Sequence, residues 1–189
     1  MLRATSFRWL PAHNETEFSP DRRYRYTLES VVGGPSPGGN GLINFIMLNP
    51  STADETHDDP SVRRCKAYAA AWGYDRAVVT NVFALRSTDP RALRKHPSPV
   101  GPLNNEWVAQ SACRASKVVA AWGLHSLHLN RHFEVIRMLA ELGVRPEVLA
   151  LSKGGIPKHP LYLSGGLRPR EWDASLRDQP GLATVGRAS

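Results

Sequence analysis

The chain has 189 residues, of which 41% are hydrophobic, and its 24 lysines and arginines outweigh 17 aspartates and glutamates to give a formal net charge of +7. This length is typical of a single domain that can bury its own core. The composition excludes collagen-like, coiled-coil and disulfide-rich scaffolds, and two cysteines are too few for a four-cysteine metal cluster.

Two strands are predicted on either side of a glycine- and proline-rich loop at residues 33–39. Before the loop, side chains alternate from Tyr24 to Val32 with the period of a half-buried strand. After it, Leu42–Leu48 is a nearly continuous apolar run, typical of a strand covered on both faces. We expect the loop to join these strands as an antiparallel pair.

From residue 59 onward, helices and strands alternate along the chain. Asp59-Pro60 and Asp89-Pro90 each read as a helix N-cap followed by proline, and Gly73 is expected to end the first helix. The elements predicted after these signals are a strand at 77–81, a helix at 103–115, a strand at 118–122, a helix at 129–142 and a strand at 148–151. This alternation predicts one α/β domain around a mostly parallel sheet, spanning residues 1–178, and a flexible tail at 179–189.

Polar or glycine residues directly follow four of the predicted buried strands. They are Asn49, Asn81, Gly123 and Ser152. In a parallel α/β sheet, ligands bind outside the carboxyl ends of the strands. We therefore expect these four loops to form a shared cleft.

The first of these loops leads into an acidic cluster. The six residues from Asp54 to Asp59 contain four acids and His57. Such a cluster could hold a hard metal ion through oxygen ligands, or it could be a solvated loop whose acids favour the start of the next helix. The spacing matches no known metal-binding loop, so we favour the second interpretation and expect no metal and no cofactor.

A basic, glycine-rich segment follows the last predicted strand. Glycines in Lys153–Gly166 allow the backbone to approach a phosphate closely. Between residues 145 and 170, a single acid, Glu147, opposes the basic residues Arg145, Lys153, Lys158, Arg168 and Arg170. This excess suits a polyanion such as nucleic acid, with a merely solubilising surface as the alternative.

Taken in chain order, these loops resemble the motifs of the uracil-DNA glycosylase superfamily. Asn49-Pro50 resembles the water-activating motif, Asn81 the asparagine that reads the flipped base, and Trp122-Gly123 the Trp-Gly pair after a later strand. His159-Pro160-Leu161-Tyr162-Leu163-Ser164 resembles the closing His-Pro-Ser-Pro-Leu-Ser loop. The resemblance covers roughly residues 42–170.

The chain also departs from the superfamily pattern. Met47 replaces the motif glycine, Asn49 replaces the catalytic aspartate of the uracil-specific branch, and Leu161-Tyr162 replaces Ser-Pro in the closing loop. The stretch Leu48–Arg63 is similar to the Leu-Asn-Pro-Ser-Thr-Ala-Asp hallmark of an uncharacterised prokaryotic domain family.

The resemblance implies a three-layer α/β sandwich with a central mostly parallel sheet, and a DNA glycosylase that flips out a base and leaves an abasic site. By this resemblance, His159 would donate a hydrogen bond to the departing base, and Asn49 would hold a water near the anomeric carbon. The residues expected at the base are Asn81, Ser51, Thr52 and Asp54. Those expected at the DNA backbone and the vacated base stack are Lys153, Lys158, Leu163, Ser164 and Arg168.

The residue after the motif proline bears on substrate choice. In the uracil-specific branch it is a tyrosine that excludes substituents at the pyrimidine 5-position, whereas here it is the smaller Ser51. We therefore expect excision of a bulky 5-substituted pyrimidine, such as glucosylated hydroxymethylcytosine, from double-stranded DNA. Such bases occur in phage genomes, so antiphage defence follows, with ordinary uracil or mismatch repair as the alternative.

Two other functions remain open from the sequence. One is a metal-dependent phosphodiesterase that uses Asp54, His57, Asp58 and Asp59, and the other is a non-catalytic DNA-binding module. No apolar run reaches 18 residues, and the first 18 residues lack the apolar core of a secretory signal. We expect a cytoplasmic monomer without membrane contact and with both cysteines reduced.

Overall fold

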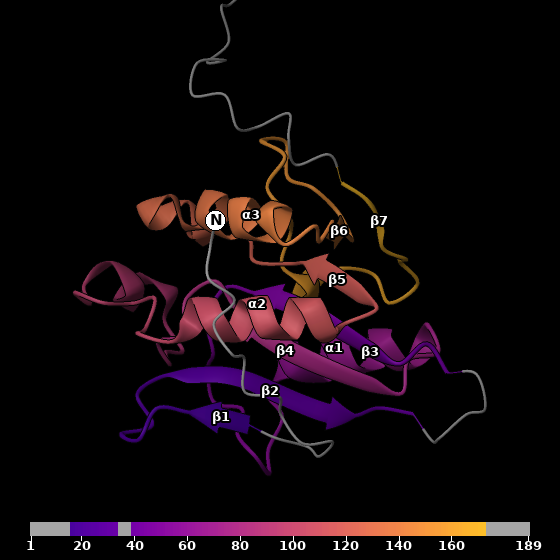
Figure 1. Cartoon of the computed structure of the whole chain (residues 1–189), viewed down its shortest axis with the longest axis horizontal. Coiled ribbons are helices and arrows are strands. Elements are labelled where there is room, and N and C mark those ends of the chain that lie inside the picture. The colour runs from indigo at the N-terminus through magenta and orange to yellow at the C-terminus, as the bar shows by residue number, and fades with distance from the viewer. Residues whose placement is uncertain (1–15, 34–38, 173–189) are drawn as a thin grey trace, which may run out of the picture.

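The computed structural model describes residues 16–33 and 39–172, which form a single sheet with helices packed on it (Figure 1). Seven strands lie side by side in the order β1-β2-β4-β3-β5-β6-β7. Their bounds are Thr16–Phe18 (β1), Arg25–Val31 (β2), Leu42–Met47 (β3), Arg76–Asn81 (β4), Lys117–Ala120 (β5), Glu147–Val148 (β6) and Arg170–Glu171 (β7). The tail predicted at 179–189 lies outside the described residues.

Three α-helices and three short 3₁₀ helices connect the strands of the described chain. The α-helices are α1 (Pro60–Ala71), α2 (Asn104–Arg114) and α3 (Arg131–Glu141). The 3₁₀ helices are η1 (Pro90–Arg94), η2 (Leu124–Asn130) and η3 (Pro160–Tyr162). The predicted α/β class is thus confirmed. No helix in the described segments is both long enough and apolar enough to span a bilayer.

The sheet is mixed rather than mostly parallel. The four central strands, β4, β3, β5 and β6, run parallel to one another, whereas β1, β2 and β7 pair antiparallel towards the edges. The strand predicted at 148–151 is also shorter than expected. After Val148 the chain folds back on itself, with a bridge between Leu151 and Pro157 and a 2.9 Å hydrogen bond from Ser152 N to the Ile156 carbonyl.

The predicted hairpin between β2 and β3 is wrong. β4 lies between them, parallel to β3 and antiparallel to β2. The apolar run of β3 explains this position, because a strand buried on both faces belongs at the centre of the sheet. β2 is not half-buried either. Its alternate polar residues are covered by partners, as Arg25 bonds the Ala53 carbonyl and Glu29 pairs with Arg76 and Arg114.

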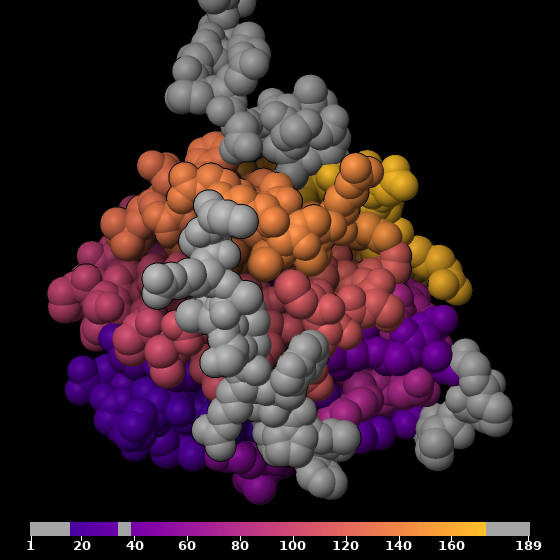
Figure 2. All heavy atoms as spheres, viewed as in Figure 1, coloured from indigo at the N-terminus to yellow at the C-terminus, as the bar shows by residue number. Residues whose placement is uncertain are grey.

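Both faces of the sheet carry a hydrophobic core. On β3 and β5, Ile46 and Val118 point towards α2 and α3, whereas Phe45 and Val119 point towards α1. Figure 2 views the α2 and α3 face, where these helices pack side by side between the β1–β2 edge and residues 160–172. Helices therefore cover both faces and leave the carboxyl ends of the parallel strands free at one edge.

The local helix signals of the sequence are confirmed. The Asp59 carboxylate accepts a 2.9 Å hydrogen bond from Val62 N at the start of α1, and Asp89 caps η1 in the same way through Arg91 N. Gly73 follows α1 with a φ of +80°, a conformation that costs glycine little. The Asp59 cap fixes where α1 begins, and the start of α1 lies at the cleft described next.

Candidate functional site

A cleft of about 820 Å³ opens at the carboxyl ends of the parallel strands. Its walls come from the loop after β3, the first turn of α1, the segment before η1, the loop after β5 and the segment that follows β6. The polar residues among its lining are Asn49, Ser51, Thr52, Asp59, Ser61, Ser87, Thr88, His125, Ser152, Lys158 and His159. The chain segments after all four predicted strands thus meet in one cleft, but of the four residues predicted there only Asn49, Gly123 and Ser152 line it.

Asn81 itself does not reach the cleft. β4 continues past Asn81, because Val82 N and Phe83 N donate to the carbonyls of Met47 and Leu48 at 2.8 and 2.9 Å. Asn81 is therefore fully buried inside the sheet, where neither atom of its amide has a hydrogen-bond partner. We leave Asn81 out of the base-contacting set for this reason.

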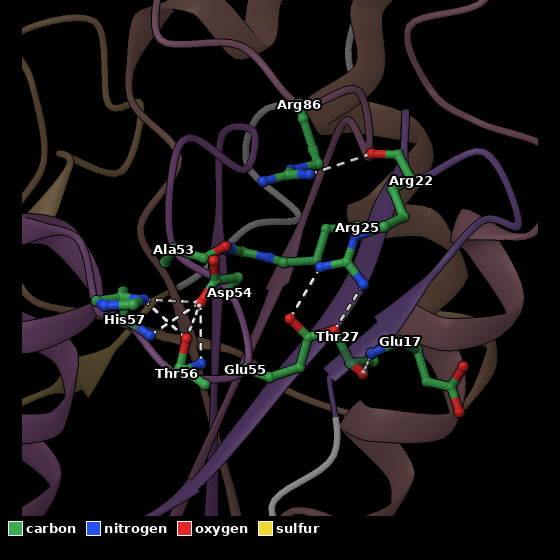
Figure 3. Close-up of polar contacts among 10 residues, drawn as sticks. All are labelled: Glu17, Arg22, Arg25, Thr27, Ala53, Asp54, Glu55, Thr56, His57 and Arg86. Carbon is green, nitrogen blue, oxygen red and sulfur yellow. Dashed lines mark hydrogen bonds and ion pairs between the residues drawn. The ribbon is translucent and has the colours of Figure 1, made fainter.

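Asp54 also lies away from the cleft. Its carboxylate accepts hydrogen bonds from the backbone N–H groups of Thr56 and His57, each at 2.9 Å, and from the Thr56 hydroxyl (Figure 3). These bonds, led by that from Thr56 N, lower the pKa of Asp54 to about 2. The carboxylate thus holds a turn together and lines a separate pocket of about 120 Å³.

Asn49 is fixed by its amide nitrogen. Nδ2 donates to the carbonyl oxygens of Pro50, Leu85 and Ser87 at 3.0, 3.4 and 2.8 Å. Ser87 N in turn donates to the Pro50 carbonyl at 2.8 Å, which ties the two loops together. No residue in the described part of the chain donates to Oδ1 of Asn49. The side chain can therefore accept a hydrogen bond from a water, but its nitrogen is already committed.

A buried arginine that the sequence patterns did not single out supports the same loop. The Arg25 guanidinium donates to the Ala53 carbonyl at 2.9 Å (Figure 3), and the residue is 1% exposed. Burial lowers the pKa of Arg25 to about 10. Because Arg25 occupies an alternate position of β2, the period-two pattern suggested a solvent-facing side chain. Only the folded structure shows that it anchors the loop after β3.

The two ring nitrogens of His159 differ in their hydrogen bonding. Its Nδ1 accepts the N–H of Leu161 at 3.3 Å, so the proton of the neutral ring lies on Nε2. Burial lowers the pKa of His159, and the negative charge of Asp59 partly opposes this. At pH 7 the ring is neutral and Nε2–H is available as a hydrogen-bond donor.

The loop after His159 is docked on α1 by a ladder of side chains. Arg64 donates to the Leu163 carbonyl, Tyr68 to the Ser164 carbonyl at 2.6 Å and Trp72 to the Leu167 carbonyl at 3.1 Å. These residues are four apart and so share one face of the helix. The ladder holds the predicted DNA-contacting residues Leu163 and Ser164 in place.

Leu163 and Tyr162 differ in how far they are free to contact a partner. Leu163 lines the cleft but packs partly against the core on the α1 side. Tyr162, which the sequence motifs did not single out, also lines the cleft and is 88% exposed. Leu124 on η2 is exposed as well, so apolar side chains occur at the cleft from two different loops.

The basic residues do not form one stripe. Lys158 is exposed and lines the cleft, whereas Lys153 and Arg168 are exposed but lie outside its lining. Arg145 precedes β6 and therefore lies at the amino ends of the parallel strands, opposite the cleft. Lys158 is thus the best placed of these cations to contact a ligand in the cleft.

Three of the acids from 54 to 59 line the separate pocket of about 120 Å³, whereas Asp59 lines the cleft. Asp54 closes its turn, Asp58 pairs with Lys66 at 2.7 Å, and Asp59 caps α1. Within residues 16–33 and 39–172, no group of three or more His, Cys, Asp or Glu side chains is arranged to hold a metal ion. The phosphodiesterase hypothesis gains no support from this arrangement.

Comparison with known proteins identifies a family but no characterised relative. A family model described as "Protein of unknown function (DUF1643)" matches residues 25–161. No curated protein and no solved structure matches the chain. The comparisons provide no link to the uracil-DNA glycosylase superfamily. Because the matched range spans most of the sequence, the chain belongs to the DUF1643 family.

Proposed function

We propose that this member of the DUF1643 family is a DNA glycosylase that takes a flipped base into the cleft and hydrolyses its N-glycosidic bond. The observation that carries the proposal is that Asn49 and His159 line the same cleft, one held to accept from a water and the other to donate to a base. Helices on both faces of the sheet support the three-layer sandwich of the uracil-DNA glycosylase superfamily.

The residues fit the charge changes of this reaction. When the bond between C1′ and the base nitrogen breaks, both electrons leave with the base, and the sugar becomes positively charged. The Nε2–H of His159 would stabilise the negative charge that spreads to a base oxygen. Oδ1 of Asn49 would hold the water that adds to C1′, and a fixed amide reduces the entropic cost of placing it.

The size and the polar lining of the cleft favour a base with a large polar substituent as the substrate. Its volume of about 820 Å³ falls in the ~300–1,000 Å³ range of pockets that take drug-sized ligands, which is more than an unmodified pyrimidine needs. Six hydroxyl side chains are among its lining, namely Ser51, Thr52, Ser61, Ser87, Thr88 and Ser152. These favour a 5-substituted pyrimidine such as glucosylated hydroxymethylcytosine, and with it a role against phage DNA.

The substrate assignment is tested by exposing matched duplexes to the protein and revealing abasic sites with alkali. The duplexes carry cytosine, uracil, hydroxymethylcytosine or glucosylated hydroxymethylcytosine at one position. We expect abasic sites with the glucosylated base and their loss in Ser51→Tyr, because the larger side chain would narrow the cleft beside residue 51. Ser98→Tyr, at an exposed serine outside the cleft, is the matched control. Release of uracil without action on the modified bases would instead support DNA repair.

Lys158→Ala is expected to weaken DNA binding to a similar extent for all sequences. An exposed lysine at the cleft would neutralise one phosphate, so its loss should reduce the slope of log K against log salt concentration by about one. Fluorescence anisotropy at several salt concentrations measures this slope. Arg145→Ala, at the opposite edge of the sheet, is expected to leave it unchanged. If the two variants behave alike, the DNA does not enter through this cleft.

Tyr162→Ala is expected to impair duplex substrates more than single strands. An exposed aromatic ring beside the cleft can fill the stack vacated by the flipped base, and base–aromatic stacking contributes about 1–3 kcal/mol. Single-turnover rates on both substrate types give the ratio. Leu163→Ala should change this ratio less, because Leu163 already packs against the core. A larger change in Leu163→Ala would instead show that Leu163 occupies the vacated base stack.

A further inference from the structure

Asp59 caps helix α1 and also lines the cleft, and capping alone does not require the second position. Its Oδ1 accepts the Val62 N–H at 2.9 Å, and the residue is 8% exposed. It nevertheless lines the cleft together with Asn49 and His159. In the described part of the chain, no side chain forms an ion pair with Asp59, and no group donates a hydrogen bond to its Oδ2. One carboxylate oxygen therefore remains available at the cleft.

The roles assigned so far to Asn49 and His159 leave the proposed reaction without a base. The water that adds to C1′ must lose a proton, and the amide of Asn49 is not basic enough to take it. Among the described residues that line the cleft, Asp59 is the only carboxylate. A carboxylate is also the group that best stabilises a positively charged sugar. The cleft thus holds, on a different element from the Asn49 loop, the chemistry that the motif aspartate supplies in the uracil-specific branch.

We propose that Asp59 is the catalytic general base of this cleft and the counter-charge for the sugar cation. The inference rests on the proposed glycosylase function. The water oxygen forms a bond to C1′ as the bond from C1′ to the base breaks with both electrons going to the base. One water proton passes to the Asp59 carboxylate, and from there to solvent. The departing base anion takes a proton from solvent, so the products are the neutral base and an abasic sugar hydroxyl.

The electrostatic surroundings of Asp59 agree with this role. Its negative charge raises the pKa of His159 against the larger effect of burial, as expected for two groups that line one cleft. The same charge acts on the buried Arg25 under the neighbouring loop. A negative group and a neutral hydrogen-bond donor in one cleft match the opposite charges that develop on the sugar and on the base.

The test separates catalysis from helix capping. Asparagine and serine are good N-cap residues, so Asp59→Asn and Asp59→Ser both keep a capping oxygen for Val62 N–H. Asp59→Asn removes only the charge, whereas Asp59→Ser removes the whole carboxylate. We expect either change to lower the single-turnover rate of base release about 10²–10⁴-fold, with DNA affinity and melting temperature nearly unchanged. Added formate should partly restore Asp59→Ser, because a small carboxylate can occupy the vacated space.

Asp89 provides a matched control. It is also followed by proline and also caps a helix, but its carboxylate pairs with Arg91 and lies outside the cleft. Asp89→Asn should release base at the wild-type rate. A wild-type rate in Asp59→Asn would overturn the assignment of Asp59 alone. A rate loss matched by a lower melting temperature, without rescue by formate, would assign Asp59 to capping. If the unaltered protein releases no base from any duplex, the proposed function fails instead.

Discussion

His159→Ala is expected to slow base release about 10²–10³-fold while leaving DNA affinity nearly unchanged, the usual effect of removing one donor that stabilises a developing anion. In the proposed reaction the Nε2–H of His159 would contact the base oxygen most strongly in the transition state, so its loss should affect turnover rather than binding. Single-turnover kinetics with saturating protein separate the two. His159→Asn tests the same donor while keeping an acceptor for the N–H of Leu161.

His96 offers a close control for this variant. It precedes a proline, and its Nδ1 accepts the N–H of Ser98 at 3.1 Å, as His159 does with Leu161, but it lies outside the cleft. His96→Ala therefore removes the same kind of local hydrogen bond without touching the proposed chemistry. It should keep the wild-type rate. A wild-type rate in His159→Ala would show that this ring does not act on the base.

Asn49→Asp is expected to inactivate the protein and to destabilise it, although it would make the motif more similar to that of the uracil-specific branch, which has an aspartate before the proline. Nδ2 of Asn49 donates to three carbonyl oxygens, of Pro50, Leu85 and Ser87. An ionised carboxylate would place negative charge against all three, and each hydrogen bond lost at this half-buried side chain costs about 1 kcal/mol. The free energy of unfolding in urea should fall below that of wild type.

Asn49→Ala distinguishes lost hydrogen bonds from added charge. Alanine removes the same donor but introduces no carboxylate, so it should be inactive yet more stable than Asn49→Asp at pH 7. The gap should narrow as the pH falls and the aspartate becomes protonated, because a proton removes the repulsion. An Asn49→Asp protein that is as stable as wild type and faster in base release would show that the Asn49 amide is needed neither to fix the loop nor to hold the water.

Local signals were predictable from the sequence because they depend on neighbours in the chain. Asp59-Pro60 and Asp89-Pro90 marked helix starts correctly, because a capping side chain needs only the backbone N–H groups two or three residues further along the chain. The hairpin between β2 and β3 was wrong because the position of β4 depends on contacts far along the chain. Polar residues of β2 such as Arg25 and Glu29 could not be predicted as buried without their distant partners.

The candidate site shows the same division. The positions of Asn49, Gly123 and Ser152 at the cleft followed from the rule that parallel strands end at one edge. Asn81 did not follow this rule, because β4 continues beside the loop of Asn49 and keeps its side chain inside the sheet. Asp59 was assigned to an acidic cluster by its sequence neighbours. Its place in the same cleft as His159 depends on where the folded chain positions the start of α1.

The most direct measurement is mass spectrometry of the small molecules released from defined duplexes by the unaltered protein. With glucosylated hydroxymethylcytosine in the duplex, we predict free modified base in amounts equal to the abasic sites, with the DNA strand intact until alkali is added. The same duplex treated with His159→Ala should release little base at equal binding. Tight binding of every duplex with no base released from any of them would contradict the glycosylase account.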